Sequence, residues 1–163
     1  MTTAYLAFGS NLADRAGAIA GAIDRLGARG VTVRARSPLY ETDAVTSDPQ
    51  PPYLNAAARV ETTLSARALL GVCLEVERAL GRVRPPGGAP APREIDVDLL
   101  LFGGAVIDEG PALIVPHPRL RERPFVRIPL ADVATRGLPH PVTDERLDVA
   151  APDPAVRPYR SGL

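Results

Sequence analysis

Two aspartates in an apolar stretch are the most suggestive chemical feature of the sequence. Asp96 and Asp98 lie within residues 95–101, which are otherwise Ile, Val and Leu. Because side chains of a strand alternate between its faces, both carboxylates project from the same side. They repel each other unless a cation neutralises them, and oxygen ligands without nearby His or Cys favour Mg²⁺. The pair therefore indicates a magnesium site, the alternative being an exposed strand face with two solvated acids.

Arginines lie close to this pair in the sequence. Arg93 precedes it, and Arg82 and Arg84 belong to a stretch, residues 82–92, that holds four prolines and two glycines. This composition predicts an irregular loop rather than a helix or strand. Arginines on such a loop beside a magnesium site suit phosphoryl transfer, since positioning and charge stabilisation supply most of that catalysis.

A second cluster favours a flat heteroaromatic ligand. Thr42, Gln50, Tyr53 and Asn55 are close in sequence, and Tyr53 and Asn55 share one face of a predicted strand. The ring can stack on a ligand while the amide reads its edge, and Phe125 can supply a second stacking face. Alternatively, Tyr53 and Phe125 fill the core and Asn55 binds a neighbouring loop.

The two histidines receive different interpretations. His117 lies between two prolines and is closely followed by Arg119, Arg121 and Arg123, so it is a candidate contact for phosphate or a nucleotide. A lone histidine is nevertheless more often structural, and His140 is interpreted that way. By default, Glu77 on a predicted helix is a solvated charge.

All 19 basic residues are arginines, and the chain has no lysine. This composition excludes a Schiff-base lysine, a lysine general base and a phosphate-binding loop of the Walker A type. If the protein handles phosphate, arginine and metal must therefore do it.

The remaining composition excludes several classes of protein. The net charge of zero argues against a nucleic-acid partner, and a single cysteine, Cys73, excludes a disulfide framework or a multi-cysteine zinc site. Cys73 lies in an apolar helical pattern and is expected to be buried. Without an apolar run of membrane-spanning length or a leader-like N-terminus, we expect a cytoplasmic protein with no membrane partner. We also expect it to be a monomer.

The hydrophobic pattern predicts an α+β fold. Helices are expected at 13–26, capped by Asn11 or Asp14, and from Ser65 to Gly81, with a short helix near 130–134. Strands are expected at residues 4–8, 31–37, 53–62 and 95–102, with a short one at 105–107.

The element order β-α-β-β-α-β is typical of a ferredoxin-like sandwich. In that fold a four-stranded antiparallel sheet carries both helices on one face. We expect one domain over residues 1–163, with a C-terminal extension that packs loosely from about residue 139.

Six segments, in order, resemble the 6-hydroxymethyl-7,8-dihydropterin pyrophosphokinase family of folate biosynthesis. They cover roughly residues 4 to 135, and Arg123 and Phe125 follow the last of them. The segments are AYLAFGSNL (4–12), SPLYET (37–42), QPPYLNAA (50–57), GRVR (81–84), REIDVD (93–98) and VPHPR (115–119).

The resemblance implies transfer of an intact pyrophosphate from ATP to the hydroxymethyl group of the pterin, with release of AMP. It implies two Mg²⁺ ions held by Asp96 and Asp98, a metal arrangement that suits in-line displacement. Arg82 and Arg93 are implied to be catalytic together with this pair.

The resemblance also implies which residues bind each substrate. The implied pterin contacts are Thr42, the backbone near Val45, Tyr53, Asn55 and Phe125. The implied nucleotide contacts are Glu77, Arg84, His117 and Arg123.

The sequence departs from the family in the loop before Arg93. The family usually has a Trp-Gly-Pro-Arg run there, whereas this chain has Gly-Ala-Pro-Ala-Pro-Arg at 88–93 and contains no tryptophan. The missing aromatic side chain motivates an alternative: a non-catalytic ferredoxin-like module that binds a nucleotide or a pterin. A structural subunit of a folate-enzyme assembly is a third possibility.

Overall fold

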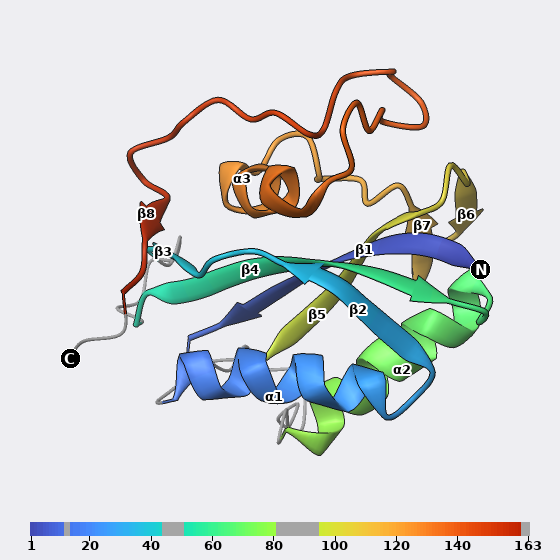
Figure 1. Cartoon of the computed structure of the whole chain (residues 1–163), viewed down its shortest axis with the longest axis horizontal. Helices are drawn as coiled ribbons and strands as arrows, with labels where there is room; N and C mark the ends of the chain where they lie inside the picture. The colour runs from blue at the N-terminus through green and yellow to red at the C-terminus, as the bar shows by residue number, and fades with distance from the viewer. Residues whose placement is uncertain (12–13, 44–50, 81–94, 161–163) are drawn as a thin grey trace.

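The computed structural model describes residues 1–11, 14–43, 51–80 and 95–160. A twisted antiparallel sheet separates two helical layers, with α1 and α2 on one face and α3 on the other (Figure 1). The expected α+β class is therefore confirmed. No helix in these ranges is long and apolar enough to cross a membrane.

Among the described residues the main sheet has six strands, and its longest path runs β5-β1-β4-β3-β8, while β2 also pairs with β4. Its strands are β1 (Thr2–Ser10), β2 (Val31–Arg36), β3 (Tyr40–Thr42), β4 (Tyr53–Thr62), β5 (Asp96–Phe102) and β8 (Arg157–Pro158). A separate two-stranded sheet pairs β6 (Ile107–Glu109) with β7 (Leu113–Val115).

The expectation of a four-stranded sheet is wrong, because β4 is long enough to pair with two strands along the same edge. Its first three residues pair with β3, and the segment from Ala58 to Thr62 pairs with β2. Between these pairings, Ser37 Oγ accepts a 2.9 Å hydrogen bond from the Ala57 amide. This side chain satisfies the backbone where Pro38 interrupts the strand.

The first two helices begin at side-chain caps. Asp14 accepts a hydrogen bond from the Gly17 amide before α1 (Arg15–Gly27), and Ser65 accepts one from the Ala68 amide before α2 (Ala66–Ala79). Each oxygen satisfies an amide that has no partner within the helix. The predicted Ser65 start is confirmed, and of the two caps considered for the first helix the structure uses Asp14.

The third helix, α3 (Pro124–Val133), is longer than the short helix expected near residues 130–134. Proline occupies its first position, where the missing amide hydrogen costs nothing, and a second proline, Pro129, lies inside it. Because this segment is rich in proline, its sequence did not predict the full helix. The helix is held by packing of Val126, Leu130 and Val133 against the sheet.

The sheet therefore has a hydrophobic core on each face. Alternate residues of the central strands point to opposite sides, so Leu6 packs toward α1 and α2 while Ala7 packs toward α3. Cys73 is completely buried in the first core, as predicted. Burial is the main cause that raises the pKa of its thiol to about 12, and Glu77 and Asp98 add to it.

The C-terminal segment is attached more firmly than the loose packing expected from its composition. Leu147 is completely buried in the core under α3, and β8 pairs with β3. His140 is also buried and its Nδ1 accepts hydrogen bonds from the Val142 and Thr143 amides, consistent with the structural role predicted for it. A few isolated buried residues and a backbone pairing leave little trace in a polar, proline-rich sequence.

Replacement of Leu147 by alanine tests this attachment. We expect Leu147→Ala to lower the free energy of unfolding by about 2–5 kcal/mol, because it removes a fully buried side chain and leaves a cavity. Urea denaturation measures the change. The matched control Val149→Ala lies two residues away on the exposed surface and should cost under about 0.5 kcal/mol. Equal, small changes in both variants would mean that the segment is not anchored.

Candidate active site

The pairing of four strands places four residues in one row across the sheet, and two of them are predicted site residues. Gly9 on β1 lies opposite Asn55 on β4 and also opposite Asp96 on β5. Tyr40 on β3 lies opposite Asn55. Directly paired residues point to the same face of a sheet, so the row runs Asp96, Gly9, Asn55, Tyr40 across four strands.

This row lies on the face that α3 covers. The next row pairs Asp98 with Ala7 and Ala7 with Ala57, and both alanines belong to the core under α3. The predicted side-by-side arrangement of Asp96 and Asp98 is therefore present, with Asp96 half-buried and Asp98 exposed. Ile95, Val97 and Leu99 point into the opposite core, as expected from the alternation.

Gly9 separates the acidic pair from Asn55. Neighbouring strands are about 4.8 Å apart, so Asp96 and Asn55 are roughly 10 Å apart across the row. A Cβ atom at Gly9 would lie 3.7 Å from Asn55 Oδ1. The absence of a side chain at Gly9 leaves open the space between the carboxylates and this amide oxygen.

Asn55 has a specific partner that explains an asparagine inside a strand. Its Nδ2 donates a 2.9 Å hydrogen bond to Thr42 Oγ1 on β3, and the side chain is buried. Tyr53, which pairs directly with Thr42, is half-buried at the start of β4. The structure therefore brings together Thr42, Tyr53 and Asn55 on one face.

Phe125 belongs to the helix above this face. It is half-buried at the second position of α3 and packs against the core beneath that helix. The guanidinium carbon of Arg123 lies 5.6 Å from the centre of its ring, a cation–π arrangement. The predicted pair Arg123 and Phe125 is thus held together at the N-terminal end of α3.

A pocket of about 330 Å³ opens at the opposite edge of the sheet, beside β5. Its wall includes Asp96, Asp98, Glu77 and His117, which are four of the predicted site residues. The apolar part of the wall is formed by Leu70, Leu74, Val97, Leu99, Pro111, Ala112, Leu113, Ile114 and Pro118. The pocket therefore joins an apolar surface to a cluster of ionisable groups.

Glu77 is buried, with 4% of its surface exposed, so its interpretation as a solvated charge is wrong. Its Oε1 accepts a 2.9 Å hydrogen bond from the Val97 amide. Because β5 ends the main sheet, this amide lies on an edge and needs a partner from outside the sheet. Glu77 thereby links α2 to the strand that carries both aspartates.

His117 reaches the same strand from the other side of the pocket. Its backbone amide donates to the Leu100 carbonyl at 2.9 Å, and its Nδ1 accepts a hydrogen bond from the Arg119 amide. Burial first, and then the positive charges of Arg123 and Arg119, lower the pKa of His117 below its usual 6.5. The ring is therefore neutral at pH 7 and carries its proton on Nε2.

Several predicted site residues lie outside the described part of the chain. These are Val45, Gln50, Arg82, Arg84 and Arg93. Within the described ranges, no group of three or more His, Cys, Asp or Glu side chains is arranged to hold a metal ion. Two carboxylates nevertheless suit Mg²⁺, which commonly binds one or two protein carboxylates and completes its shell with water and substrate phosphates.

Sequence reasoning missed the place of Tyr40 in the row. Its hydroxyl donates a hydrogen bond to Asp132 on α3, which connects β3 to the helix that carries Phe125. Burial, followed by the hydrogen bond and charge of Asp132, raises the pKa of Tyr40 to about 12. Its position two residues before Thr42 was a usable signal, because side chains at this spacing share a strand face.

The link between Glu77 and Val97 can be tested by substitution. We expect Glu77→Ala to lower the free energy of unfolding by about 1–3 kcal/mol, because a buried amide loses its partner. Glu77→Gln keeps an acceptor oxygen and should cost less. Urea denaturation and hydrogen exchange at the Val97 amide measure both effects.

The matched control is Glu75→Ala, which removes an exposed carboxylate of the same helix that pairs with Arg29. Exposed pairs contribute under about 1 kcal/mol. Equal losses in Glu77→Ala and Glu75→Ala would contradict the link.

Comparisons with known proteins agree on one family. A family model described as 7,8-dihydro-6-hydroxymethylpterin-pyrophosphokinase (HPPK) matches residues 5–135. A 2-amino-4-hydroxy-6-hydroxymethyldihydropteridine pyrophosphokinase of Methylorubrum extorquens is 45% identical over 135 residues, covering 82% of this chain and 84% of the relative. The protein of the same name from Bacillus subtilis is 42% identical, covering 80% of this chain and 77% of the relative.

A longer relative and a solved structure extend this match. The folic acid synthesis protein fol1 of Schizosaccharomyces pombe is 37% identical and covers 97% of this chain, which spans 22% of that protein. The crystal structure of Plasmodium falciparum HPPK-DHPS has a TM-score of 0.67 at 14% identity. It covers 90% of this chain, which spans 43% of that structure, and at this identity the likeness concerns the fold alone.

The alternative of a non-catalytic binding module is not supported, because the family and these two bacterial relatives are named as pyrophosphokinases. With the family model matched over residues 5–135 and relatives up to 45% identical, the chain belongs to the 7,8-dihydro-6-hydroxymethylpterin pyrophosphokinase family of folate biosynthesis.

Proposed function

We propose that this chain transfers pyrophosphate from ATP to the hydroxymethyl group of 6-hydroxymethyl-7,8-dihydropterin, giving the pterin diphosphate and AMP. One observation carries the assignment of the site. Asp96 and Asp98 border the pocket beside β5 on one side, and Asn55 with Thr42 lies beyond Gly9 on the other. Two substrates can thus meet at the acidic pair from opposite directions.

The pterin occupies the side of Asn55. The hydrogen bond from Nδ2 to Thr42 fixes the amide and leaves Oδ1, beside Gly9, as an acceptor for ring N–H groups. Tyr53 and Phe125 supply the stacking faces, and the backbone near Val45 completes the contact. The chain has no tryptophan that could stack on the pterin, so we assign this role to Tyr53 and Phe125.

ATP occupies the pocket beside β5. Its apolar wall, including Leu70 and Ile114, accommodates the base, and Glu77 lies on the wall nearest to α2. The neutral His117 donates a hydrogen bond from Nε2, while Arg84 and Arg123 contact phosphate oxygens. With no lysine in the chain, arginine supplies the positive side chains for the triphosphate.

Asp96 and Asp98 are the residues that would hold two Mg²⁺ ions. Bound there, magnesium supplies charge neutralisation to the phosphate oxygens. The two carboxylates fix the place on the sheet at which triphosphate and hydroxyl meet, and Arg82 and Arg93 stabilise the charge that develops on the transferred group. Attack at the β-phosphorus then follows from where the hydroxyl is held.

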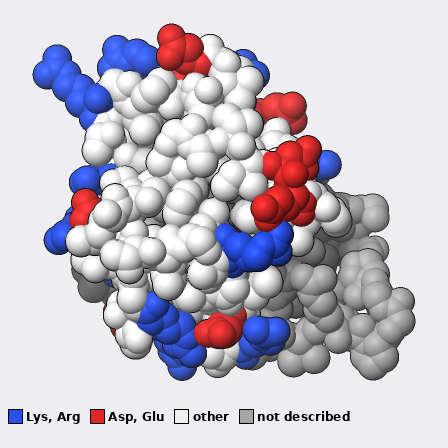
Figure 2. Space-filling view, turned by 90° about the vertical axis from the view of Figure 1, so that its right-hand side faces the viewer, with Lys and Arg blue, Asp and Glu red and all other residues white. Residues whose placement is uncertain are grey.

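We propose a monomer that acts in the cytoplasm on small molecules, without a nucleic-acid or membrane partner. Figure 2 supports the exclusion of nucleic acid for one face of the molecule, since acidic and basic side chains are interspersed there on a mostly uncharged surface.

Turnover by the wild type is tested by incubating the protein with Mg²⁺, ATP and the hydroxymethyl pterin. We expect AMP as the nucleotide product. Formation of ADP, or no turnover, would overturn the proposal.

Calorimetry in the same buffers should detect tighter ATP binding when Mg²⁺ is present, whereas equal binding with and without the ion would argue against a role for the metal.

Asp98→Ala tests the acidic pair. We expect turnover to fall by at least about 100-fold, because removing one element of electrostatic stabilisation costs that much in comparable sites. Thermal unfolding should stay close to the wild type, since Asp98 is exposed. The control Asp24→Ala removes an exposed carboxylate on α1 and should keep normal turnover. A near-normal rate for Asp98→Ala would refute the role of the pair.

A further inference from the structure

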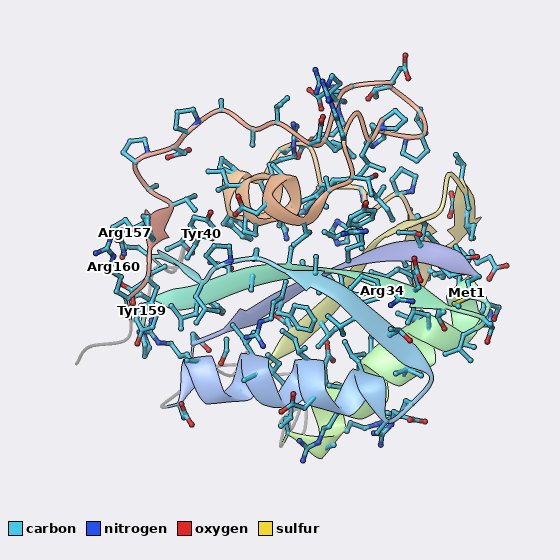
Figure 3. All side chains as sticks on the ribbon, viewed as in Figure 1. Met1, Arg34, Tyr40, Arg157, Tyr159 and Arg160 are labelled. Atoms are coloured by element: carbon cyan, nitrogen blue, oxygen red, sulfur yellow. The ribbon has the colours of Figure 1, made fainter. Side chains whose placement is uncertain are left out.

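The C-terminal segment adds a strand to the edge of the sheet next to the pterin side. Residues Arg157 and Pro158 of β8 pair with Glu41 and Tyr40 of β3, and the Tyr159 amide donates a 2.9 Å hydrogen bond to the Leu39 carbonyl. Figure 3 shows Arg157, Tyr159 and Tyr40 gathered at this end of the sheet. The segment lies outside residues 5–135, the part that matches the family.

Ion pairs join the same strands. An Arg157 guanidinium nitrogen lies 3.1 Å from Asp43 Oδ1 and 3.6 Å from Glu41 Oε1. The other oxygen of Glu41 lies 2.7 Å from Arg15, and the side chains of both Arg15 and Glu41 are about one-fifth to one-quarter exposed. Partial burial makes this inner pair less open to screening than surface pairs.

Arg15 connects four segments. It starts α1, pairs with Glu41 on β3 and donates a 2.9 Å hydrogen bond to the carbonyl of Pro52, the residue before Tyr53. Its guanidinium also lies 5.3 Å from the centre of the Tyr159 ring. The C-terminal segment therefore contacts the residue that ties β3 to the start of β4.

β3 depends on such neighbours because it is very short. It has three residues, and its partner on the inner side is the beginning of β4. Strands of this length contribute few hydrogen bonds and open easily at an edge. β8 gives β3 a neighbour on its outer side at Tyr40 and Glu41, the two residues that lead to Thr42.

We propose that Arg157 and Tyr159 are positioning residues for the pterin substrate. They hold β3 from outside so that Thr42 stays within hydrogen-bond distance of Asn55, and Asn55 keeps the amide orientation that reads the pterin. This inference rests on the proposed function and deepens it. It means that a segment outside residues 5–135 contributes to the affinity for the pterin.

The two substrates are proposed to bind at opposite edges of the sheet. The pocket proposed for ATP lies beside β5, at the opposite edge of the sheet from β8. Loosening β3 should therefore weaken pterin binding and leave ATP binding almost unchanged. A general loss of stability would affect both substrates together.

The test uses the full chain with the double substitution Arg157→Ala and Tyr159→Ala. We expect KM for the pterin to rise about five-fold or more, the equivalent of about 1 kcal/mol, while KM for ATP and kcat stay within about two-fold. Calorimetric titration with the pterin in the absence of ATP should give the same loss of affinity. Hydrogen exchange should be faster at the amides of β3.

Arg160→Ala is the matched control, since it removes the same charge from an exposed neighbour in the segment. Arg157→Lys keeps the charge and should restore part of the affinity lost in Arg157→Ala. If the double variant fails to fold, the single variants Arg157→Ala and Arg157→Lys, with Arg160→Ala as the control, test the proposal.

Each outcome is decisive. Unchanged pterin affinity, an equal rise in both KM values, or the same effect in Arg160→Ala would overturn the positioning role. Failure of the wild type to form AMP while it binds pterin would overturn the proposed function alone, because the effect of the substitutions on pterin binding is measured without turnover. Failure of the wild type both to bind pterin and to form AMP would overturn both.

Discussion

The antiparallel pairing of β1 with both β4 and β5 is the constraint on which the candidate site depends. It places Gly9 opposite Asn55 on one side and opposite Asp96 on the other. A shift of one residue in either register would turn the polar side chains of that strand into the core beneath α1 and α2. The buried apolar residues on that face, among them Leu6 and Val97, therefore fix the register and with it the position of the polar groups.

The two edges of the sheet are built differently, in keeping with the two substrates proposed for them. Beside β5 the edge is bordered by α2 and β7, which line a pocket with both apolar and charged walls, and Glu77 satisfies an outward amide of the strand. Beside β3 the edge is covered by β8 and fastened by charged side chains, Arg15 and Arg157 with Glu41. The first edge offers a cavity for a base, whereas the second keeps a short strand in place.

Local features of the chain could be predicted from its sequence, whereas features that depend on distant contacts could not. The strand at residues 53–62, the cap at Ser65 and the common face of Asp96 and Asp98 follow from alternation and capping within a few residues. The burial of Glu77 depends on an edge amide twenty positions away, and β8 pairs with a strand more than a hundred residues earlier. Its composition predicted loose packing of the C-terminal segment, because a few isolated buried residues and a backbone pairing have no periodic signature.

The central claim is that the acidic pair lies between the two substrates. A crystal structure with Mg²⁺, a non-hydrolysable ATP analogue and the hydroxymethyl pterin tests it most directly. We expect the nucleotide base in the pocket beside β5, the pterin ring against Asn55 and Tyr53, and magnesium bound to Asp96 and Asp98 between them. Both ligands on the same side of Asp96, or magnesium bound away from the two aspartates, would contradict the account.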